Sequence, residues 1–348
     1  MRNHYPAIAP VLPGLAVAAI LTAVIAVTSS RLAAFDIVGR TVPFAYPWRL
    51  ASPTAAARLT AWGGYLLHNL LAWGIIYFAR RQKPKFDGGL RWFNWSMAAV
   101  NGIFIGLHIL QTHLFYDGLA QDVPELTALG SVALMLIVIL ILETPRRGLI
   151  FGKKVRFQQR FLQVIRHYHG YLFSWATIYT FWYHPTEGTW GHLMGFFYMF
   201  MLFIQSSLLF NRTHLNKWWT FALEVFVLVH GAAVAVLQGN AMWPMFVFGF
   251  GAMIVLTQMY GLGLDTWARR GVAAAFIAAA VSAYAIMGNL PGLNEIFRIP
   301  VLDYAVLFLL YAIYLGVDRL ARVFRGSLPA QAEQERVKGI VPEGNHER

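Results

Sequence analysis

The sequence predicts an all-α, polytopic integral membrane protein built as a helical bundle. Hydrophobic residues make up 58% of the chain and charged residues 13%, and the mean hydropathy is +0.52. A soluble domain contains roughly 45–50% apolar and 25% charged residues. A bilayer core of about 30 Å needs about 20 apolar residues per helix. We therefore expect about ten transmembrane helices, at residues 11–28, 59–79, 92–114, 127–143, 164–183, 191–210, 218–237, 244–264, 271–288 and 300–317.

Lys and Arg residues are concentrated in every second loop, and this alternation predicts the orientation. Of the 28 basic residues, all but Arg31, Arg40, Arg49, Arg58 and Arg298 lie in alternate loops or in the termini. By the positive-inside rule, both termini are cytoplasmic and the protein is a multi-pass protein of the inner (cytoplasmic) membrane. The net charge of +12 is explained by the attraction of these loops to an anionic leaflet. We expect a lipid bilayer, and no nucleic acid, as a partner.

The first segment follows Arg2 and ends at Ser29, as a cleavable signal peptide does. The run is long for such a peptide and follows three prolines, so we interpret it as a permanent anchor. No soluble domain interrupts the chain: residues 1–317 form one transmembrane domain, and the polar composition of 318–348 predicts a disordered cytoplasmic tail. The absence of cysteine excludes disulfides, thiolate metal sites, iron–sulfur clusters and covalent c-type haem.

The second and third segments carry polar residues at membrane depth. His68 lies near the middle of the second, one turn from Gly64, where a neighbour can approach closely. In the third, Asn94, Asn101 and His108 recur at every seventh residue and share one helical stripe. That stripe is either a hydrogen-bonded seam between helices or the lining of a path that ends at His108.

The fifth segment has a histidine at each end. His169 and His184 are 15 positions apart (184 minus 169), which is about 60° around a helix and ~22 Å along it. This spacing resembles that of transmembrane b-type cytochromes, in which one helix holds two stacked haems. His214 and His230 near the seventh segment would then be the partner ligands. The alternative is a single b haem, held by two of His184, His192, His230, His108 and His68.

A short loop between the fifth and sixth segments brings His184, Glu187 and His192 to the outer surface. Two histidines and a carboxylate form a ligand set for zinc or non-haem iron. The alternative is that these residues only decorate a tight turn among the lipid headgroups. The predicted metal ligands are His108, His113, His184, His192 and His230. The predicted haem ligands are His169, His184 and His230. The cofactor is haem b or a histidine-ligated iron, copper or zinc.

Glu224 in the seventh segment is the predicted catalytic residue. It lies six residues before His230 and must be paired, neutral or in contact with water. A proton relay through both residues suits an enzyme or a transporter, whereas a protonated Glu224 bonded to a neighbouring helix would be structural. Gly249 and Gly251 in the eighth segment indicate close helix packing.

These residues favour an integral membrane oxidoreductase with a histidine-ligated haem b or metal centre near the outer leaflet. The aromatic content of 15% suits a flat, lipid-soluble substrate such as a quinone, and hence electron transport. Two alternatives remain open. One is a proton-coupled transporter that uses Glu224 and His230. The other is a scaffold or assembly subunit of a membrane complex, in which the histidines only pack.

Overall fold

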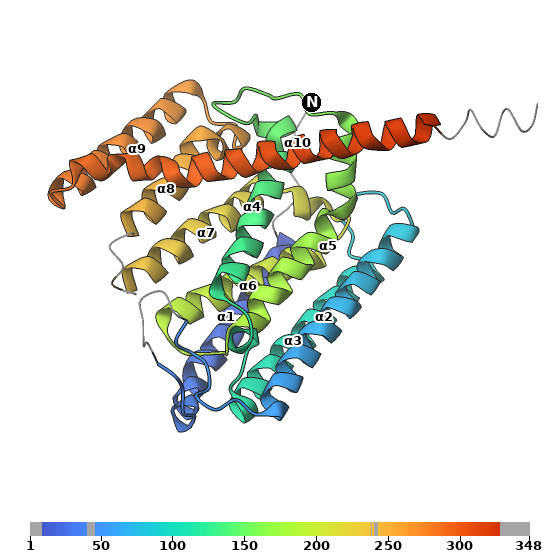
Figure 1. Cartoon of the computed structure of the whole chain (residues 1–348), viewed down its shortest axis with the longest axis vertical. Coiled ribbons are helices and arrows are strands. Elements are labelled where there is room, and N and C mark those ends of the chain that lie inside the picture. Colours follow the sequence, from blue (N-terminus) through green and yellow to red (C-terminus); the bar gives the residue numbers. More distant parts are fainter. Residues whose placement is uncertain (1–8, 40–45, 238, 240–242, 328–348) are drawn as a thin grey trace, which may run out of the picture. The chain divides into compact units, whose positions relative to one another are not determined.

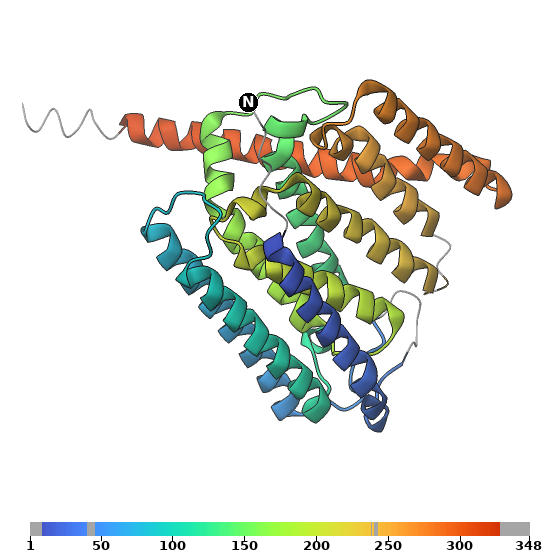
Figure 2. The ribbon, with the colours of Figure 1, turned by 180° about the vertical axis from the view of Figure 1, so that it is seen from behind.

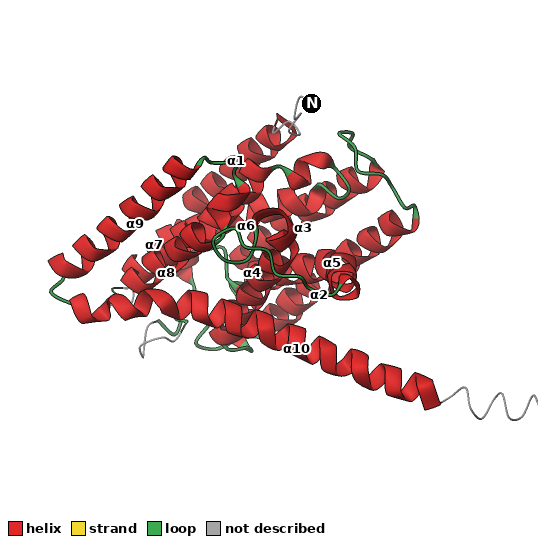
Figure 3. Ribbon diagram, turned by 90° about the horizontal axis from the view of Figure 1, so that it is seen from above, coloured by secondary structure: helices red, strands yellow, loops and turns green. Residues whose placement is uncertain are grey.

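A computed structural model describes residues 9–39, 46–237, 239 and 243–327 of the chain (Figure 1). Within these ranges the chain forms α-helices joined by loops and 3-10 turns and has no strand, which confirms the all-α prediction (Figure 3). The α-helices are α1 (Leu12–Thr28), α2 (Ala55–Arg81), α3 (Trp92–Phe115), α4 (Glu125–Arg147), α5 (Gln159–Tyr183), α6 (Trp190–Ser207), α7 (Lys217–Leu237), α8 (Trp243–Leu256), α9 (Thr266–Ile286) and α10 (Arg298–Ser327).

Local signals in the sequence set several helix ends. Thr54 and Asp265 cap α2 and α9, where each side chain accepts a hydrogen bond from the backbone N–H three residues later (3.1 and 2.8 Å). Such a bond satisfies one of the free N–H groups of the first turn. At the other end, α4 stops at Gly148, whose φ of +79° is readily adopted by glycine.

Seven helices in the described ranges are long and apolar enough to cross a membrane, which supports a multi-pass membrane protein. These spans are Ala9–Ala34, Trp92–Phe115, Glu125–Arg147, Lys217–Leu237, Trp243–Gly261, Thr266–Ile286 and Leu290–Val323. Seven of the roughly ten expected transmembrane helices therefore meet this criterion. The three remaining helices are α2, α5 and α6, in which histidine, arginine, asparagine and tyrosine lower the mean hydropathy.

The second half of α5 and helix α6 lie in the interior of the helices before α7 (Figures 1 and 2). Helix α5 packs against α2, α4 and α6, and α6 also packs against α1, α3 and α7. Their side chains Phe181, Trp182, Phe196 and Phe200 are at most 2% exposed. A helix can carry polar residues where they face protein. Such residues lower the mean hydropathy of α5 and α6, so the hydropathy criterion does not select these two helices.

Helices α7, α8 and α9 follow one another and pack in sequence. Glycines of α8 permit close packing against α9 and the start of α10: a Cβ on Gly251 would lie 2.9 Å from Phe276 Cε2 of α9, and one on Gly249 would lie 2.8 Å from Ile299 Cδ1 of α10. Both distances are shorter than a carbon–carbon contact allows. The prediction of close packing at these two glycines is confirmed.

Two compact units divide the chain, one up to Asp303 and one from Tyr304 onward. The predicted domain boundary at 317 falls inside α10, which is continuous to Ser327. The tail from 328 to 348 lies outside the described residues. The histidines singled out above and Glu224 belong to the first unit.

Candidate functional site

The junction between α5 and α6 brings His184 and His192 against one tyrosine. His184 directly follows α5, and His192 lies in the first turn of α6. The hydroxyl of Tyr46 is hydrogen-bonded to His184 Nδ1 (2.9 Å) and to His192 Nε2 (2.8 Å). A hydroxyl donates one hydrogen, so Tyr46 donates to one imidazole and accepts from the other. We refer to these three residues as the Tyr46 cluster.

The short connection between the two helices positions both histidines. Pro185 disfavours a helical conformation at His184, and α5 accordingly ends at Tyr183. Thr189 caps α6, and its hydroxyl is also hydrogen-bonded to His192 Nδ1 (2.8 Å). That bond leaves Nε2 of His192 for Tyr46 and fixes the orientation of the ring.

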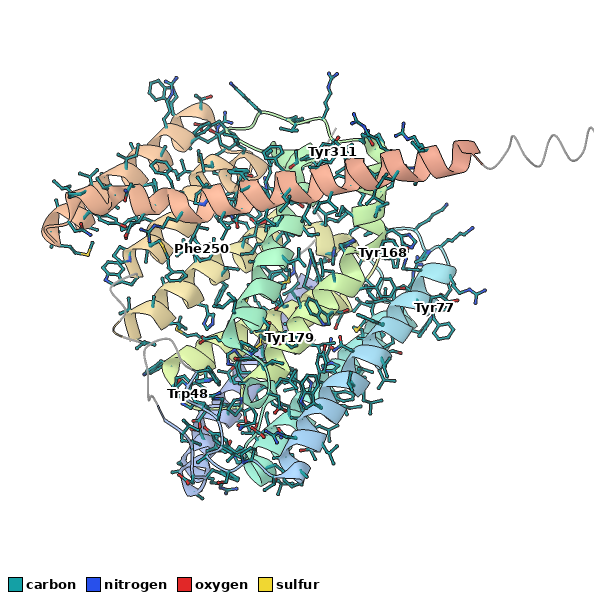
Figure 4. All side chains as sticks on the ribbon, in the orientation of Figure 1. Trp48, Tyr77, Tyr168, Tyr179, Phe250 and Tyr311 are labelled. Atoms are coloured by element: carbon teal, nitrogen blue, oxygen red, sulfur yellow. The ribbon has the colours of Figure 1, made fainter. Side chains whose placement is uncertain are left out.

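Aromatic rings enclose the Tyr46 cluster. The ring of Trp48, labelled in Figure 4, lies 4.5 Å from that of His192, and Tyr183 lies 5.4 Å from Tyr46. Burial raises the pKa of the Tyr46 phenol well above its ordinary value. It also lowers the pKa of His184, and the nearby His192 adds to this effect. The cluster therefore holds a neutral phenol between two neutral imidazoles.

His108 and His230 border this cluster without joining its hydrogen bonds. His108 Nε2 donates to the carbonyl oxygen of His184 (2.8 Å). His230 packs against Gly195, one turn along α6 from His192, where a Cβ would lie 2.9 Å from its Cε1. The Nδ1 atoms of both histidines are buried without a hydrogen-bond partner in the described part of the chain. Of the five predicted metal ligands, these four therefore gather around one junction.

His113, the fifth predicted ligand, is directed elsewhere. Its Nδ1 bonds to the carbonyl oxygen of Ile109 (2.8 Å) and its Nε2 to that of Thr28 (3.2 Å). The ring thus lies between α3 and the end of α1. The helix continues unbroken past Gln111 and Thr112, so it does not unwind as joint binding with His108 would require.

Glu187 was expected to form a metal-ligand set with His184 and His192, but it is hydrogen-bonded to Tyr116 instead. Its Oε1 accepts a hydrogen bond of 2.5 Å from the Tyr116 hydroxyl. Burial raises the pKa of Glu187, although this hydrogen bond opposes the rise. Tyr116 itself has a φ of +65°, an uncommon conformation for a side chain of this size. The carboxylate is therefore tied to the end of α3 rather than to the two imidazoles.

The opposite end of α5 holds a second pair of histidines. The rings of His169 and His214 lie 6.5 Å apart. His169 Nδ1 donates to the carbonyl oxygen of Arg166 (2.9 Å), and His214 Nδ1 donates to that of Gln205 (3.3 Å). Neither Nε2 has a hydrogen bond within the described ranges. Both rings thus hold the same tautomer, with Nε2 unprotonated.

Glu224 pairs with Arg147 rather than with His230. Arg147 NH1 donates to both carboxylate oxygens of Glu224, at 2.8 and 2.7 Å, and both side chains are about 5% exposed. Arg147 ends α4 and lies 77 residues from Glu224 in the sequence. No hydrogen bond joins Glu224 to His230 among the described residues, so the predicted relay has no direct link.

The polar stripe of α3 forms the predicted seam between helices. Asn94 donates to the carbonyl oxygens of Ser207 and Leu209 (2.8 and 2.9 Å). Asn101 donates to the carbonyl oxygen of Phe203 and to the hydroxyl of Ser206. Between the two alternatives for this stripe, these bonds support the seam.

His68 belongs to the same network. Its Nε2 donates to Asn101 Oδ1 (3.1 Å), and its Nδ1 accepts from the indole N–H of Trp182 (3.4 Å). The indole lies directly over Gly64, where a Cβ would overlap the ring. Both nitrogens of His68 are therefore engaged, which makes it a packed core histidine and leaves no nitrogen for haem.

Sequence reasoning missed Tyr46 and Arg147. Tyr46 lies in the loop between α1 and α2, 138 and 146 residues from its two partners. The neighbouring Pro47 and Trp48 are the only local signal that this part of the loop is ordered. The charge pattern places Arg147 in a basic cytoplasmic loop, and pairing is only one of the three states that it leaves open for Glu224.

Within the described residues, no three histidine, aspartate or glutamate side chains come together as a group able to hold a metal ion. The Tyr46 cluster offers three donors only when the phenol oxygen is counted with the two imidazoles. Comparison with family models, curated proteins and solved structures found no match for this chain.

Proposed function

We propose that the protein is an integral membrane oxidoreductase whose histidine-ligated centre lies at the Tyr46 cluster. The observation that carries this proposal is the phenol oxygen of Tyr46, 2.9 Å from His184 Nδ1 and 2.8 Å from His192 Nε2. Ligands at about 2.0–2.1 Å from a tetrahedral metal ion lie roughly 3.3 Å from one another. Small movements of these three side chains would therefore admit iron, copper or zinc.

The surroundings of the cluster suit a redox centre. Nitrogen and phenolate ligands are typical of iron and copper, and an enclosed aromatic site excludes water from a reactive metal. Thr189 would orient His192 by its hydrogen bond to Nδ1, as the partners of metal-bound histidines do. The wall formed by Trp48 and Tyr183 fits a lipid-soluble substrate such as a quinone.

A second centre at His169 and His214 would extend this function to electron transfer through the membrane. Two imidazoles on opposite sides of one metal ion place their ring centres roughly 6 Å apart, and these lie at 6.5 Å. Each Nδ1 donates to a backbone carbonyl, the usual support of a metal-bound histidine. The pair lies about 22 Å along α5 from His184, an arrangement similar to that of b-type cytochromes.

Metal and haem analysis of the detergent-purified protein tests the proposal. His192→Ala should remove the metal or haem of the Tyr46 cluster, and His214→Ala that of the second pair, while both proteins still insert. His167→Ala serves as the control, because among the described residues the side chain of this exposed histidine is hydrogen-bonded to Arg80 alone. Full iron, copper, zinc and haem content in both variants, or none in the wild type, would contradict the oxidoreductase proposal.

We further propose that α2, α5 and α6 also cross the membrane, which gives ten spans with both termini in the cytoplasm of an inner membrane. The length of α2 and α5, 27 and 25 residues, exceeds the roughly 20 that a span needs. The exposed apolar side chains of α2, such as Leu59 and Leu70, and the charge alternation of the loops support this count. If no cofactor is found, a scaffold subunit of a membrane complex becomes the better proposal.

A proton-coupled transporter is the second candidate, and the buried pair of Glu224 and Arg147 favours it. An ionised carboxylate at membrane depth is costly and is typical of proton or ion pathways. Uptake of labelled solutes into proteoliposomes, driven by a pH gradient, would distinguish transport from redox chemistry. The Glu224→Gln variant should abolish such uptake and leave cofactor content unchanged.

A further inference from the structure

A cavity of about 30 Å³ lies between α4, α7, α8 and the first turns of α10, apart from the Tyr46 cluster. Its wall includes Arg147, Glu224, Gln258 and Asp303, and otherwise apolar side chains such as Phe250. Phe250 and Trp48 are labelled in Figure 4 and lie well apart. A cavity of this size holds about two waters or one small ion and no organic substrate.

Three polar groups on this wall have no partner in the described part of the chain. Asp303 is 8% exposed, and its carboxyl group makes no hydrogen bond or ion pair there. Arg147 Nε and Gln258 Oε1 are buried and unbonded as well. Buried polar groups are nearly always satisfied, so three such groups around one cavity indicate a ligand.

The charges around the cavity leave one negative charge without compensation. Arg147 carries one positive charge, and its NH1 is already bonded to both oxygens of Glu224. Asp303 adds a second carboxylate. On α4, Glu143 and Arg146 are paired with each other and cancel. Arg147 and Glu224 thus compensate each other, and Asp303 adds an uncompensated carboxylate to an otherwise apolar wall, where a lone charge is expensive.

Size and charge together identify the ligand class. An anion is excluded by the excess negative charge. A metal cation such as Ca²⁺ takes six to eight oxygen ligands, whereas only Asp303 and Gln258 offer free oxygens here. A proton needs no such shell, and it neutralises Asp303 while leaving the ion pair of Arg147 and Glu224 intact.

We propose that Asp303, Glu224 and Arg147 form a proton-binding site that holds a single proton, carried by Asp303 in the resting state. The guanidinium of Arg147 compensates the charge of Glu224. Water in the cavity would join Asp303 to Arg147 Nε and Gln258 Oε1. The site shares no residue with the proposed metal centres and stands independently of them, and it would supply a proton-coupled step of either candidate function.

Infrared spectroscopy of the full-length protein in lipid nanodiscs tests this site, because a protonated carboxyl group absorbs apart from a carboxylate. At neutral pH the wild type should show a carboxyl band that shifts in D₂O. Asp303→Asn should lose it. Asp318→Asn is the matched control, since this carboxylate farther along α10 is bonded to Arg322, and the variant should keep the band.

Several results would overturn the proposal. They are a wild-type spectrum without the band, a band that survives in Asp303→Asn, or one lost in Glu224→Gln alone. A band that disappears when choline is replaced by sodium at constant pH would show a cation site instead. If Asp303→Asn does not fold, Asp303→Glu should retain a shifted band, and its absence would equally contradict proton binding.

Discussion

Gly195 is the residue on which the position of His230 depends. The imidazole of His230 packs where a Cβ of residue 195 would be, with only 2.9 Å between that position and Cε1. A Cβ at this position would force the imidazole to shift, because α6 and α7 approach each other closely here. Replacing Gly195 by alanine adds one methyl group and therefore tests whether His230 must stay beside the Tyr46 cluster.

We expect Gly195→Ala to destabilise the protein by about 1–3 kcal/mol, the usual cost of overpacking a core. His230 would have to move away from α6, so any metal bound near it should also be lost. Thermal unfolding of the purified protein and metal content measure both effects. Gly102→Ala is the control, because a Cβ there meets nothing within 4 Å; equal stability of the two variants would refute the predicted clash.

Asp117 makes stability depend on pH. The residue is 1% exposed, and burial raises the pKa of its carboxyl group to about 6; nearby Asp122 adds to the rise and Arg58 opposes it. The unfolded chain has an ordinary aspartate pKa near 3.9. The folded protein therefore keeps the proton to higher pH than the unfolded chain does, and stability should fall as pH rises from about 4 to about 6.

Asp117→Asn should remove that loss. The variant should match the wild type at the acidic end and be the more stable protein above about pH 6, as measured by thermal unfolding across this range. Asp36→Asn, at an exposed position of another loop, should leave the profile unchanged. A decline of the same size in Asp117→Asn and the wild type would assign the pH dependence to other groups.

At the scale of elements, α3 and α6 are held together by hydrogen bonds rather than by apolar packing alone. Asn101 connects three helices, since it accepts from His68 on α2 and donates to Phe203 and Ser206 on α6. Within a membrane, apolar packing between helices gains little over packing with lipid. Such bonds therefore decide which helices are neighbours.

Asn101→Leu should cost about 1–3 kcal/mol, because His68 and the α6 acceptors lose their partner. Asn69→Leu is the control: in the part of the chain that the structure describes, this amide donates only to Tyr65 of its own helix, so its loss should cost less. Denaturation in detergent measures both. In a double variant with His68→Phe, the two costs should not add, and full additivity would show that the two side chains are not coupled.

The membrane topology is a property of the whole chain, and cysteine labelling can test it without a signal from native thiols. Because the protein has no cysteine, single-cysteine variants can be labelled cleanly. Lys154→Cys should react only after membrane permeabilisation, and Ala51→Cys should react with an impermeant reagent from outside. Both positions are exposed. Labelling of Lys154→Cys from outside would reverse the orientation proposed here.

The sequence by itself determined the class of protein, because the apolar runs and the polar seam of α3 are local features. Asn94 and Asn101 were predicted on one stripe by helix periodicity alone, and the structure shows their bonds to the other side of that seam. The hydropathy criterion does not select α2, α5 or α6 as membrane spans. Some of their polar groups bond to residues of other segments, as His68 of α2 does to Asn101 of α3, and no single segment contains both partners.

Only the tertiary structure decided which residues meet. The contacts of Tyr46 with His184 and His192 span 138 and 146 residues, and that of Arg147 with Glu224 spans 77. Such pairs depend on the rotation and depth of each helix and on loop conformation, which composition and spacing do not encode residue by residue. Histidines at both ends of α5 are evident from the sequence. The tertiary structure decides their partners: His192 of α6 for His184, and His214 for His169.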